Sequence, residues 1–273
     1  MQQELDQFFT PEKDAVKFIN KVDGLYGLST YDNIIEPSAG AGSFFKNLPK
    51  NAIGLDLEPL HKDIIKMDFF GYEFPKGKTI VIGNPPYGRR GSLALQFINK
   101  SAKYADVIAF VLPRGFKRVA MQNSVDLSLH LVYEEFIEDF ELPCGKIHKV
   151  KSIFQVWEKR EEKREKVEEP KSHPDFTLIH KHVSWITAEE LSTIKEEYPL
   201  AIGQNKMRIE DSKNISKGSI WFVKPLTKNV REIFENTTFE SAYWTTGAPS
   251  LSKGDIINGY KTTLTGYRNT KTN

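Results

Sequence analysis

The sequence has 273 residues, which is enough for one large or two modest domains, and its 39% hydrophobic and 27% charged residues exclude a disordered chain. No apolar run is long enough to span a membrane, and a net charge of +2 is too small to indicate a nucleic-acid partner by itself. The polar start Met1–Asp6 argues against a secretory signal peptide, and the single Cys144 cannot form an internal disulfide. We therefore expect a cytoplasmic protein.

Residues 1–157 alternate short apolar runs with helical stretches and predict a first domain. Strands are expected where β-branched runs end in Gly, Pro or Asp, at 33–35, 52–55, 63–65, 79–82 and 107–112. A helix is expected between the last two strands, from the spacing of Leu93, Phe97, Ile98 and Ala102. Two later runs, 129–140 and 152–157, flank a turn-like segment and predict an antiparallel pair that ends the sheet. The series predicts an open α/β sheet with helices on both faces.

The composition changes after residue 157. Twelve of the fourteen residues from Glu158 to Lys171 are charged, which is typical of a solvated helix extension or linker, here taken as 158–172. Residues 173–273 then predict a smaller α+β unit with strands at 175–180 and 219–223 and a helix near 187–198. The tail from Lys261 is rich in Thr, Lys and Asn, and we expect it to be loosely ordered.

A glycine loop and an acid follow the first two predicted strands. Ligands of open α/β sheets bind at the carboxyl ends of the strands, and Gly40 and Gly42 within Glu36–Phe44 permit tight turns close to a ligand. Asp56 ends the second strand, where an acid binds ribose in dinucleotide folds. Because no G-x-G-x-x-G is present, a cofactor with a pyrophosphate is disfavoured. The loop alone could also be only a tight turn.

The tetrapeptide Asn84-Pro85-Pro86-Tyr87 follows the fourth predicted strand. Asn84 offers an amide oxygen, and the carbonyl of Pro85 has no local donor because Pro86 lacks an N–H. Tyr87 supplies a flat aromatic face. An amino group on a planar ring requires two such acceptors and such a surface. A proline-rich turn packed by a tyrosine is the alternative, and the position of the motif behind a glycine loop and an acid argues against it.

Together these segments resemble the amino-methyltransferases of nucleic acid, in the γ order that places the cofactor motifs before the catalytic one. The resemblance covers about residues 6–157. Asp6–Pro11 is similar to the element that closes over the methionine end of the cofactor, and Glu36–Phe44 to the glycine motif. Asp56 resembles the ribose-binding acid and Asp68-Phe69 the adenine-binding pair. Asn84–Tyr87 matches the catalytic motif.

The resemblance implies a Rossmann-like sheet that binds S-adenosylmethionine and no metal. The catalytic residues implied are Asn84, Pro85, Pro86 and Tyr87. The cofactor-binding residues implied are Phe9, Thr10, Pro11, Glu36, Ser38, Gly40, Gly42, Asp56, Leu57, Asp68, Phe69 and Asn84. The histidines at 180 and 182 are expected to lie on an ordinary strand face, because no cysteine or acidic cluster accompanies them.

Local basic residues predict a nucleic-acid partner. Five of them follow the fourth and fifth strands and are expected around the mouth of the site, namely Arg89, Arg90, Arg114, Lys117 and Arg118. The C-terminal unit adds cations and aromatic residues that are candidates for target recognition, namely Lys206, Arg208, Lys213, Lys217, Lys224, Trp221 and Phe222. DNA is the expected partner, with RNA second.

The function implied is site-specific adenine-N6 methylation of DNA, as in restriction-modification. One alternative is an enzyme of the same chemistry that acts on RNA adenine or on a protein glutamine. Glutamine-modifying relatives normally carry a helical domain before the core, whereas about 32 residues precede the first predicted strand here. The other alternative is a non-catalytic nucleic-acid-binding subunit, and the intact Asn84, Tyr87 and Asp56 argue against it.

Overall fold

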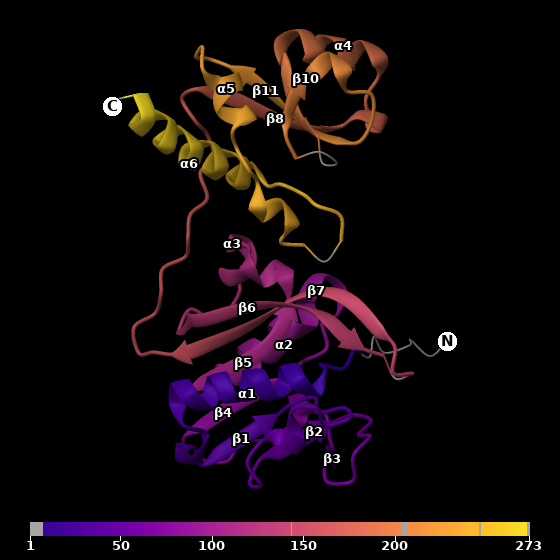
Figure 1. Ribbon diagram of the computed structural model, residues 1–273, viewed down its shortest axis with the longest axis vertical. Helices are drawn as coiled ribbons and strands as arrows, with labels where there is room; N and C mark the ends of the chain where they lie inside the picture. Colours follow the sequence, from indigo (N-terminus) through magenta and orange to yellow (C-terminus); the bar gives the residue numbers. More distant parts are fainter. Residues whose placement is uncertain (1–7, 143, 204–206, 246, 272–273) are drawn as a thin grey trace. The chain divides into compact units, whose positions relative to one another are not determined.

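The computed structural model describes residues 8–142, 144–203, 207–245 and 247–271. The chain divides into two compact units, with unit 1 ending at Val167 and unit 2 beginning at Glu168 (Figure 1). This division falls inside the segment predicted as a charged linker, and residues 160–172 contain no helix. Arg164 ties the first part of the segment to unit 1, because its guanidinium donates to the carbonyls of Leu129 (2.8 Å) and Val125 (3.0 Å).

Unit 1 is built on a seven-stranded sheet in the order β3-β2-β1-β4-β5-β7-β6. The first five strands are parallel, and β7 runs antiparallel to both of its neighbours. The strands are β1 (Asn33–Glu36), β2 (Ile53–Asp56), β3 (Ile65–Lys66), β4 (Thr79–Gly83), β5 (Val107–Pro113), β6 (Leu129–Glu141) and β7 (Ile147–Lys159). The α/β class and the antiparallel pair at the end of the sheet are confirmed.

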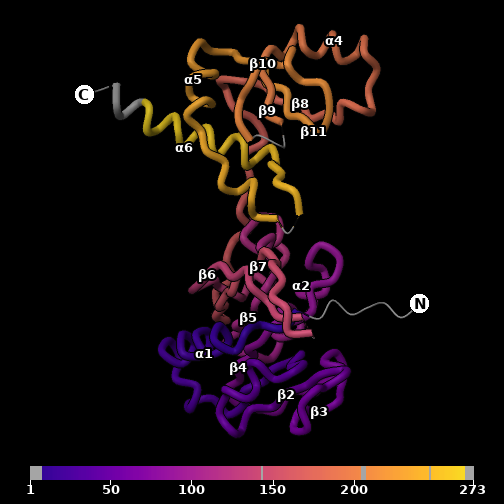
Figure 2. Tube along the Cα trace, turned by 45° about the vertical axis from the view of Figure 1, so that its right-hand side comes forward, coloured from indigo at the N-terminus to yellow at the C-terminus, as the bar shows by residue number. Residues whose placement is uncertain are grey.

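Alternating side chains build a separate core on each face of this sheet. Ile80 and Ile82 of β4 pack with the buried residues of α1 (Glu12–Tyr26), which lies along the sheet in Figure 2. Val81, between them, packs on the opposite face with α2 (Ser92–Ser101). A short helix, α3 (Val119–Gln122), follows β5. None of the described helices is both long and apolar enough to cross a membrane.

Unit 2 contains a four-stranded antiparallel sheet in the order β10-β9-β11-β8. Its elements are β8 (Phe176–His182), α4 (Ala188–Glu197), β9 (Leu200–Gly203), β10 (Ile209–Asp211), β11 (Ser219–Pro225), α5 (Val230–Glu235) and α6 (Lys253–Lys271). Residues of α4 pack on one face, and those of α5 and α6, which lie together in Figure 2, pack on the other.

The C-terminal tail differs from what the sequence predicts. The expectation of a loosely ordered tail is wrong for residues 261–271, because α6 continues through them to Lys271. Ile256, Ile257 and Tyr260 are fully buried against the sheet of unit 2. This face, together with Leu264 and Tyr267, which pack on the same core, stabilises a helix whose other residues are mostly polar.

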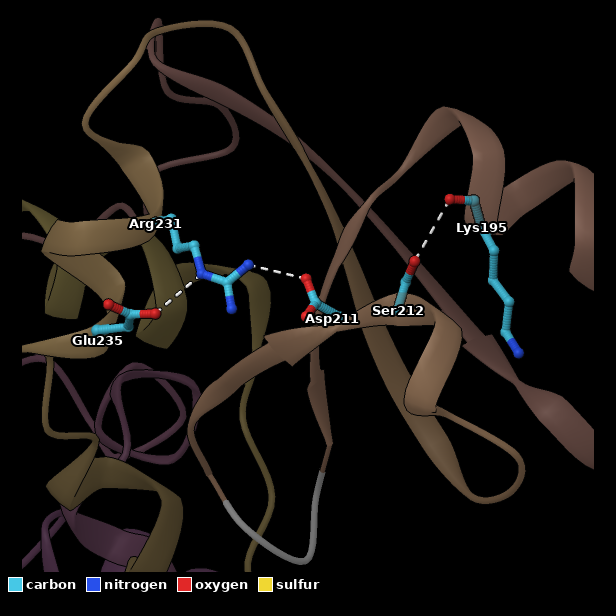
Figure 3. Close-up of polar contacts among 5 residues, drawn as sticks. All are labelled: Lys195, Asp211, Ser212, Arg231 and Glu235. Atoms are coloured by element: carbon cyan, nitrogen blue, oxygen red, sulfur yellow. Dashed lines mark hydrogen bonds and ion pairs between the residues drawn. The ribbon is translucent and has the colours of Figure 1, made fainter.

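Polar side chains join the outer elements of unit 2 (Figure 3). Arg231 on α5 donates to Asp211 at the end of β10 (2.8 Å) and to Glu235 on its own helix (2.9 Å). The buried hydroxyl of Ser212 donates to the carbonyl of Lys195 near the end of α4 (3.3 Å). The helices on both faces are therefore tied to the end of β10.

Candidate active site

The glycine loop after β1 is linked to the end of β2. Gly40 and Gly42 have φ values of 51° and 85°, in the left-handed region that favours glycine. The N–H of Gly40 donates to Oδ2 of Asp56 (2.7 Å), and Oδ1 of Asp56 accepts from the N–H of Glu58 (2.8 Å). A side chain at position 40 would also lie about 3.0 Å from the ring of Phe9. The loop therefore lies between the acid and the N-terminal segment.

Asn84, directly after β4, is held from two sides. Its Nδ2 donates to the carbonyl of Phe8 (3.0 Å), and its own backbone carbonyl accepts from the hydroxyl of Ser38 (3.1 Å). Because a carbonyl can only accept, the amide nitrogen must face Phe8. The amide oxygen Oδ1 is buried and has no hydrogen-bond partner within the described part of the chain. The side chain is thus oriented with an acceptor left free.

The segment before α1 lies between Asn84 and the outer end of the β6–β7 hairpin. The backbone of Phe9 exchanges two hydrogen bonds with Glu141 at the end of β6 (2.9 and 2.8 Å). The ring of Phe8 stacks on His148 of β7, with centroids 5.3 Å apart. Asp6 and Gln7 of the predicted motif fall outside the described residues, whereas Phe9 and Thr10 lie beside the end of the β6–β7 hairpin and the glycine loop.

Three buried oxygen atoms at this edge have no partner among the described residues: Oγ1 of Thr10, Oε2 of Glu36 and Oδ1 of Asn84. Glu36 lies against the end of β4, since a side chain at Gly83 would approach its Cγ to 3.0 Å. Burial raises the pKa of Glu36 well above its usual range. An unpaired buried polar group costs about 1–3 kcal/mol. A polar ligand that reached these atoms would remove that cost.

Tyr87 is packed by its ring and anchored by its hydroxyl. The ring packs against the core on the α2 face, and the hydroxyl donates to Oγ of Ser152 on β7 (2.8 Å). Burial raises the pKa of Tyr87 well above its usual range, so the phenol is protonated. Of the two prolines before it, Pro85 is buried and Pro86 is half-buried.

Three of the predicted cofactor-binding residues, Leu57, Asp68 and Phe69, follow the outer strands β2 and β3. Asp68 is exposed, and its Oδ1 accepts from the N–H of Phe70 (2.9 Å). The ring of Phe69 is buried and stacks on Phe97 of α2, with centroids 4.9 Å apart, so it belongs to the core. Leu57 is 56% exposed. Leu57 and Asp68 therefore present side chains at the surface, whereas Phe69 supports the turn from beneath.

The five predicted rim cations lie in the loops after β4 and β5, and Arg114 and Lys117 among them form ion pairs with β6. Arg114 donates to Glu138 of β6 (2.6 Å), and its guanidinium lies 4.5 Å from the ring of Phe136. Lys117 forms an ion pair with Glu134. Arg89 and Arg90 are exposed, and Arg118 precedes α3. The rim is thus less positive than its arginines and lysines alone indicate.

Of the cation and aromatic set predicted for unit 2, Arg208, Lys213 and Lys217 are exposed, whereas three other members make contacts within the unit. Phe222 is fully buried, and Trp221 donates to the carbonyl of Leu251 (3.0 Å). Lys224 pairs with Glu197 (3.2 Å). Lys206 falls outside the described residues. Within the described ranges, no group of three His, Cys, Asp or Glu side chains is arranged to hold a metal ion.

Two residues at the site were missed from the sequence. Phe8 acts through its backbone carbonyl, and the only signal was its place beside Phe9-Thr10-Pro11. Ser152 is a small polar residue directly before the apolar Ile153 and Phe154, and that exception was a usable signal.

No protein-family model matches the chain, and no curated protein resembles it in sequence. Among solved structures, a Pyrococcus horikoshii protein provisionally assigned as an RNA methyltransferase is 17% identical, with a TM-score of 0.46 over 57% of this chain and 87% of that one. The 23S rRNA methyltransferase ErmE is 18% identical, with a TM-score of 0.42 over 57% and 71%. The M protein of the type I restriction enzyme EcoKI is 14% identical, with a TM-score of 0.41 over 96% and 71%. The functional assignment therefore depends on the geometry of the site.

Proposed function

We propose that this chain is an S-adenosylmethionine-dependent methyltransferase that methylates N6 of adenine in DNA. One observation carries the proposal. The amide of Asn84 is held by the carbonyl of Phe8, so that Oδ1 remains buried and free, three residues before the ring of Tyr87. An oriented acceptor next to an aromatic face is what an amino group on a planar ring requires.

The residues around Asn84 fit the cofactor. Asp56 keeps lone pairs on both oxygens beyond the two backbone contacts, so it can also accept from ribose hydroxyls. The unpaired oxygens of Thr10 and Glu36 suit the polar methionine end, and a positively charged ligand would favour the buried carboxylate of Glu36. When bound, S-adenosylmethionine supplies a methyl group that is already strongly electrophilic.

The protein's contribution to the reaction is mainly positioning. Asn84 accepts one N6–H hydrogen bond through Oδ1, and the carbonyl of Pro85 accepts the other. These bonds favour a more tetrahedral nitrogen, whose lone pair otherwise delocalises into the adenine ring. Tyr87 stacks on the base after it leaves the duplex, a step that costs a few kcal/mol. No strong base is required, because the nitrogen becomes acidic once it is methylated.

We assign nucleic-acid contacts to both parts of the chain. Arg89 and Arg90 are exposed beside the proposed catalytic motif and are suited to phosphate contacts. Residues 173–273 are proposed to contribute further contacts and little to cofactor binding. Their separate core supports this division of roles.

The test is to incubate the protein with cofactor labelled on its methyl group and with DNA, RNA or protein, and then to identify the methylated group. We expect N6-methyladenine in DNA with the wild type, and none with Asn84→Ala. If the labelled methyl group were found on adenine in RNA, the proposed reaction would stand and the substrate would be RNA instead of DNA. Label on glutamine, or binding of nucleic acid without methylation, would contradict the proposal.

A further inference from the structure

The hydroxyl of Tyr87 has a partner on a distant strand. It donates to Oγ of Ser152 at 2.8 Å, across 65 residues of sequence. From the sequence, the ring of Tyr87 is expected to supply a flat stacking surface, and no role is expected for its hydroxyl. A ring that only stacks on a base needs no such contact, because stacking uses the π face alone.

Ser152 is placed by the sheet and not by a loop. It lies on β7, where it pairs with Pro113 of β5 on one side and with Ile137 of β6 on the other. Its side chain is fully buried. A buried hydroxyl is costly unless it is hydrogen-bonded, and the next two residues of the strand, Ile153 and Phe154, are apolar and buried. The strand β7 therefore holds a polar anchor for the tyrosine of the proposed catalytic motif.

We propose that Ser152 is a positioning residue for methyl transfer, acting through the hydroxyl of Tyr87. This inference rests on the proposed function of the site. The hydroxyl lies on the long axis of the phenol ring, so fixing it restrains the tilt of the ring relative to the sheet. The sheet in turn places Asn84, which directly follows β4. Ser152 thus fixes the position of the Tyr87 ring relative to Oδ1 of Asn84.

The inference predicts a specific relation among four proteins: wild type, Ser152→Ala, Tyr87→Phe and the double variant. Single-turnover methylation should be about 3- to 10-fold slower in each single variant, as expected for loss of one hydrogen bond. The double variant should be no slower than either single variant, because all three lack the same contact. Cofactor affinity should remain unchanged. Ser152→Thr, which keeps a hydroxyl, should recover most of the rate if the added methyl group is accommodated.

A matched control separates positioning from loss of a buried hydroxyl. Ser101 of α2 is also fully buried, and its hydroxyl donates to the carbonyl of Phe97 (2.9 Å), remote from the catalytic motif in sequence. Ser101→Ala should lower thermal stability by a similar amount and leave the methylation rate unchanged. Equal rate losses in Ser101→Ala and Ser152→Ala would overturn the inference, as would multiplicative losses in the double variant.

A readout without methyl transfer keeps the inference testable if the proposed function fails. Protein labelled with 3-fluorotyrosine gives one fluorine signal for each of its ten tyrosines, and the Tyr87 signal is identified by its absence in Tyr87→Phe. Ser152→Ala should shift or broaden that signal, whereas Ser101→Ala should not. An unchanged Tyr87 signal in Ser152→Ala overturns the positioning role. A shifted signal in a protein that methylates no nucleic acid supports the anchor and rejects the proposed function.

Discussion

Buried polar side-chain atoms that lack a partner are unevenly distributed between the two units of the described chain. In unit 1, three oxygens at one edge of the sheet, on Thr10, Glu36 and Asn84, are buried without a partner among the described residues. In unit 2, the polar side chains at the end of β10 are bonded to other protein groups, as Arg231 and Ser212 are in Figure 3. Unpaired buried groups cost stability. Among the described residues, Nδ1 of His182 is the one such atom in unit 2, and the three oxygens gathered at one edge of unit 1 support the cofactor site proposed there.

The difference follows from strand direction. In the parallel part of unit 1, β1, β2 and β4 all end at the same edge, so Ser38, Asp56 and Asn84 meet although they are distant in sequence. In the antiparallel sheet of unit 2, strands that neighbour each other in the sheet end at opposite edges. The polar residues at those ends join neighbouring elements. The comparison predicts that side-chain changes at the edge of unit 1 affect chemistry more than stability.

The largest effect is expected at Asn84. Asn84→Ala should slow methyl transfer by on the order of 10²–10³-fold, because the oriented acceptor acts on the reacting nitrogen, and should leave cofactor binding nearly intact. Asn33 is the matched control, since its amide at the opposite end of β1 donates to Oγ1 of Thr79 (3.0 Å). Asn33→Ala should lower stability and retain the rate of the folded fraction. Single-turnover assays measure the rate of methyl transfer, and thermal unfolding measures stability. A fully active Asn84→Ala would remove the catalytic assignment.

The next effect is expected at Asp56. Asp56→Ala should weaken cofactor binding by about 1.5–3 kcal/mol, the value of hydrogen bonds to a charged group. The loss includes the contact that holds Gly40, so the glycine loop should also become more mobile. Asp68→Ala should have a smaller effect, because Asp68 is exposed and bonded only to a local N–H. Calorimetric titration compares the two variants, and wild-type affinity in folded Asp56→Ala would reject the ribose-binding role.

Removal of unit 2 tests the division of roles. A chain ending at Glu169 should retain cofactor affinity and bind nucleic acid about 10-fold or more weakly, with a reduced dependence on salt, because fewer phosphate contacts remain. Equilibrium binding at several salt concentrations measures the affinity for nucleic acid and its salt dependence, and cofactor titration measures the affinity for the cofactor. Unfolding of the shortened chain would show that unit 1 depends on unit 2 for its stability.

The elements that were predicted correctly are those whose signal is local. The strands β1, β2, β4 and β5 are continuous apolar runs because both faces of a parallel sheet are buried, and their loops carry the predicted motifs. The helix α1 was not predicted, although Ala15, Phe18, Ile19 and Val22 lie at helical spacing. The polar composition of the tail concealed α6, because among the described residues after Lys261 only Leu264 and Tyr267 pack on the core of unit 2.

The contacts that refine the site could not be predicted, because each depends on tertiary structure. The sequence placed Asn84 and Tyr87 after a strand, but their partners, Phe8 and Ser152, lie 76 and 65 residues away. The ion pairs of Arg114 and Lys117 with β6 likewise required the antiparallel pairing to be known. The roles of the site residues in binding and catalysis stay predictions.

A smaller effect is expected at the rim. Glu138→Gln should remove the charge that pairs with Arg114 and so raise nucleic-acid affinity about 2- to 5-fold at low salt. The control is Glu135→Gln, since Glu135 pairs with Lys17 of α1 and leaves Arg114 unaffected. Both variants lose one negative charge, so any effect of net charge cancels in the comparison. Equal affinities in the two variants would show that Arg114 makes no contact with nucleic acid.

The smallest effect concerns stability and pH. Hydrogen bonding to Lys17 lowers the pKa of Glu135, and the hydroxyl of Tyr133 also donates to this carboxylate (2.7 Å). A carboxyl whose pKa is lowered by folding stabilises the protein above its unfolded pKa, and that stabilisation is lost as the pH falls through the folded value. Because the pair is partly exposed, Glu135→Gln should lower the free energy of unfolding by about 0.5–1 kcal/mol near neutral pH and by less at about pH 4. Glu235→Gln, which breaks the more exposed pair with Arg231 in unit 2, should cost about 0–0.5 kcal/mol. Urea unfolding at both pH values tests this order, and a larger loss in Glu235→Gln would show that the surface pairs of unit 2 contribute more than their exposure indicates.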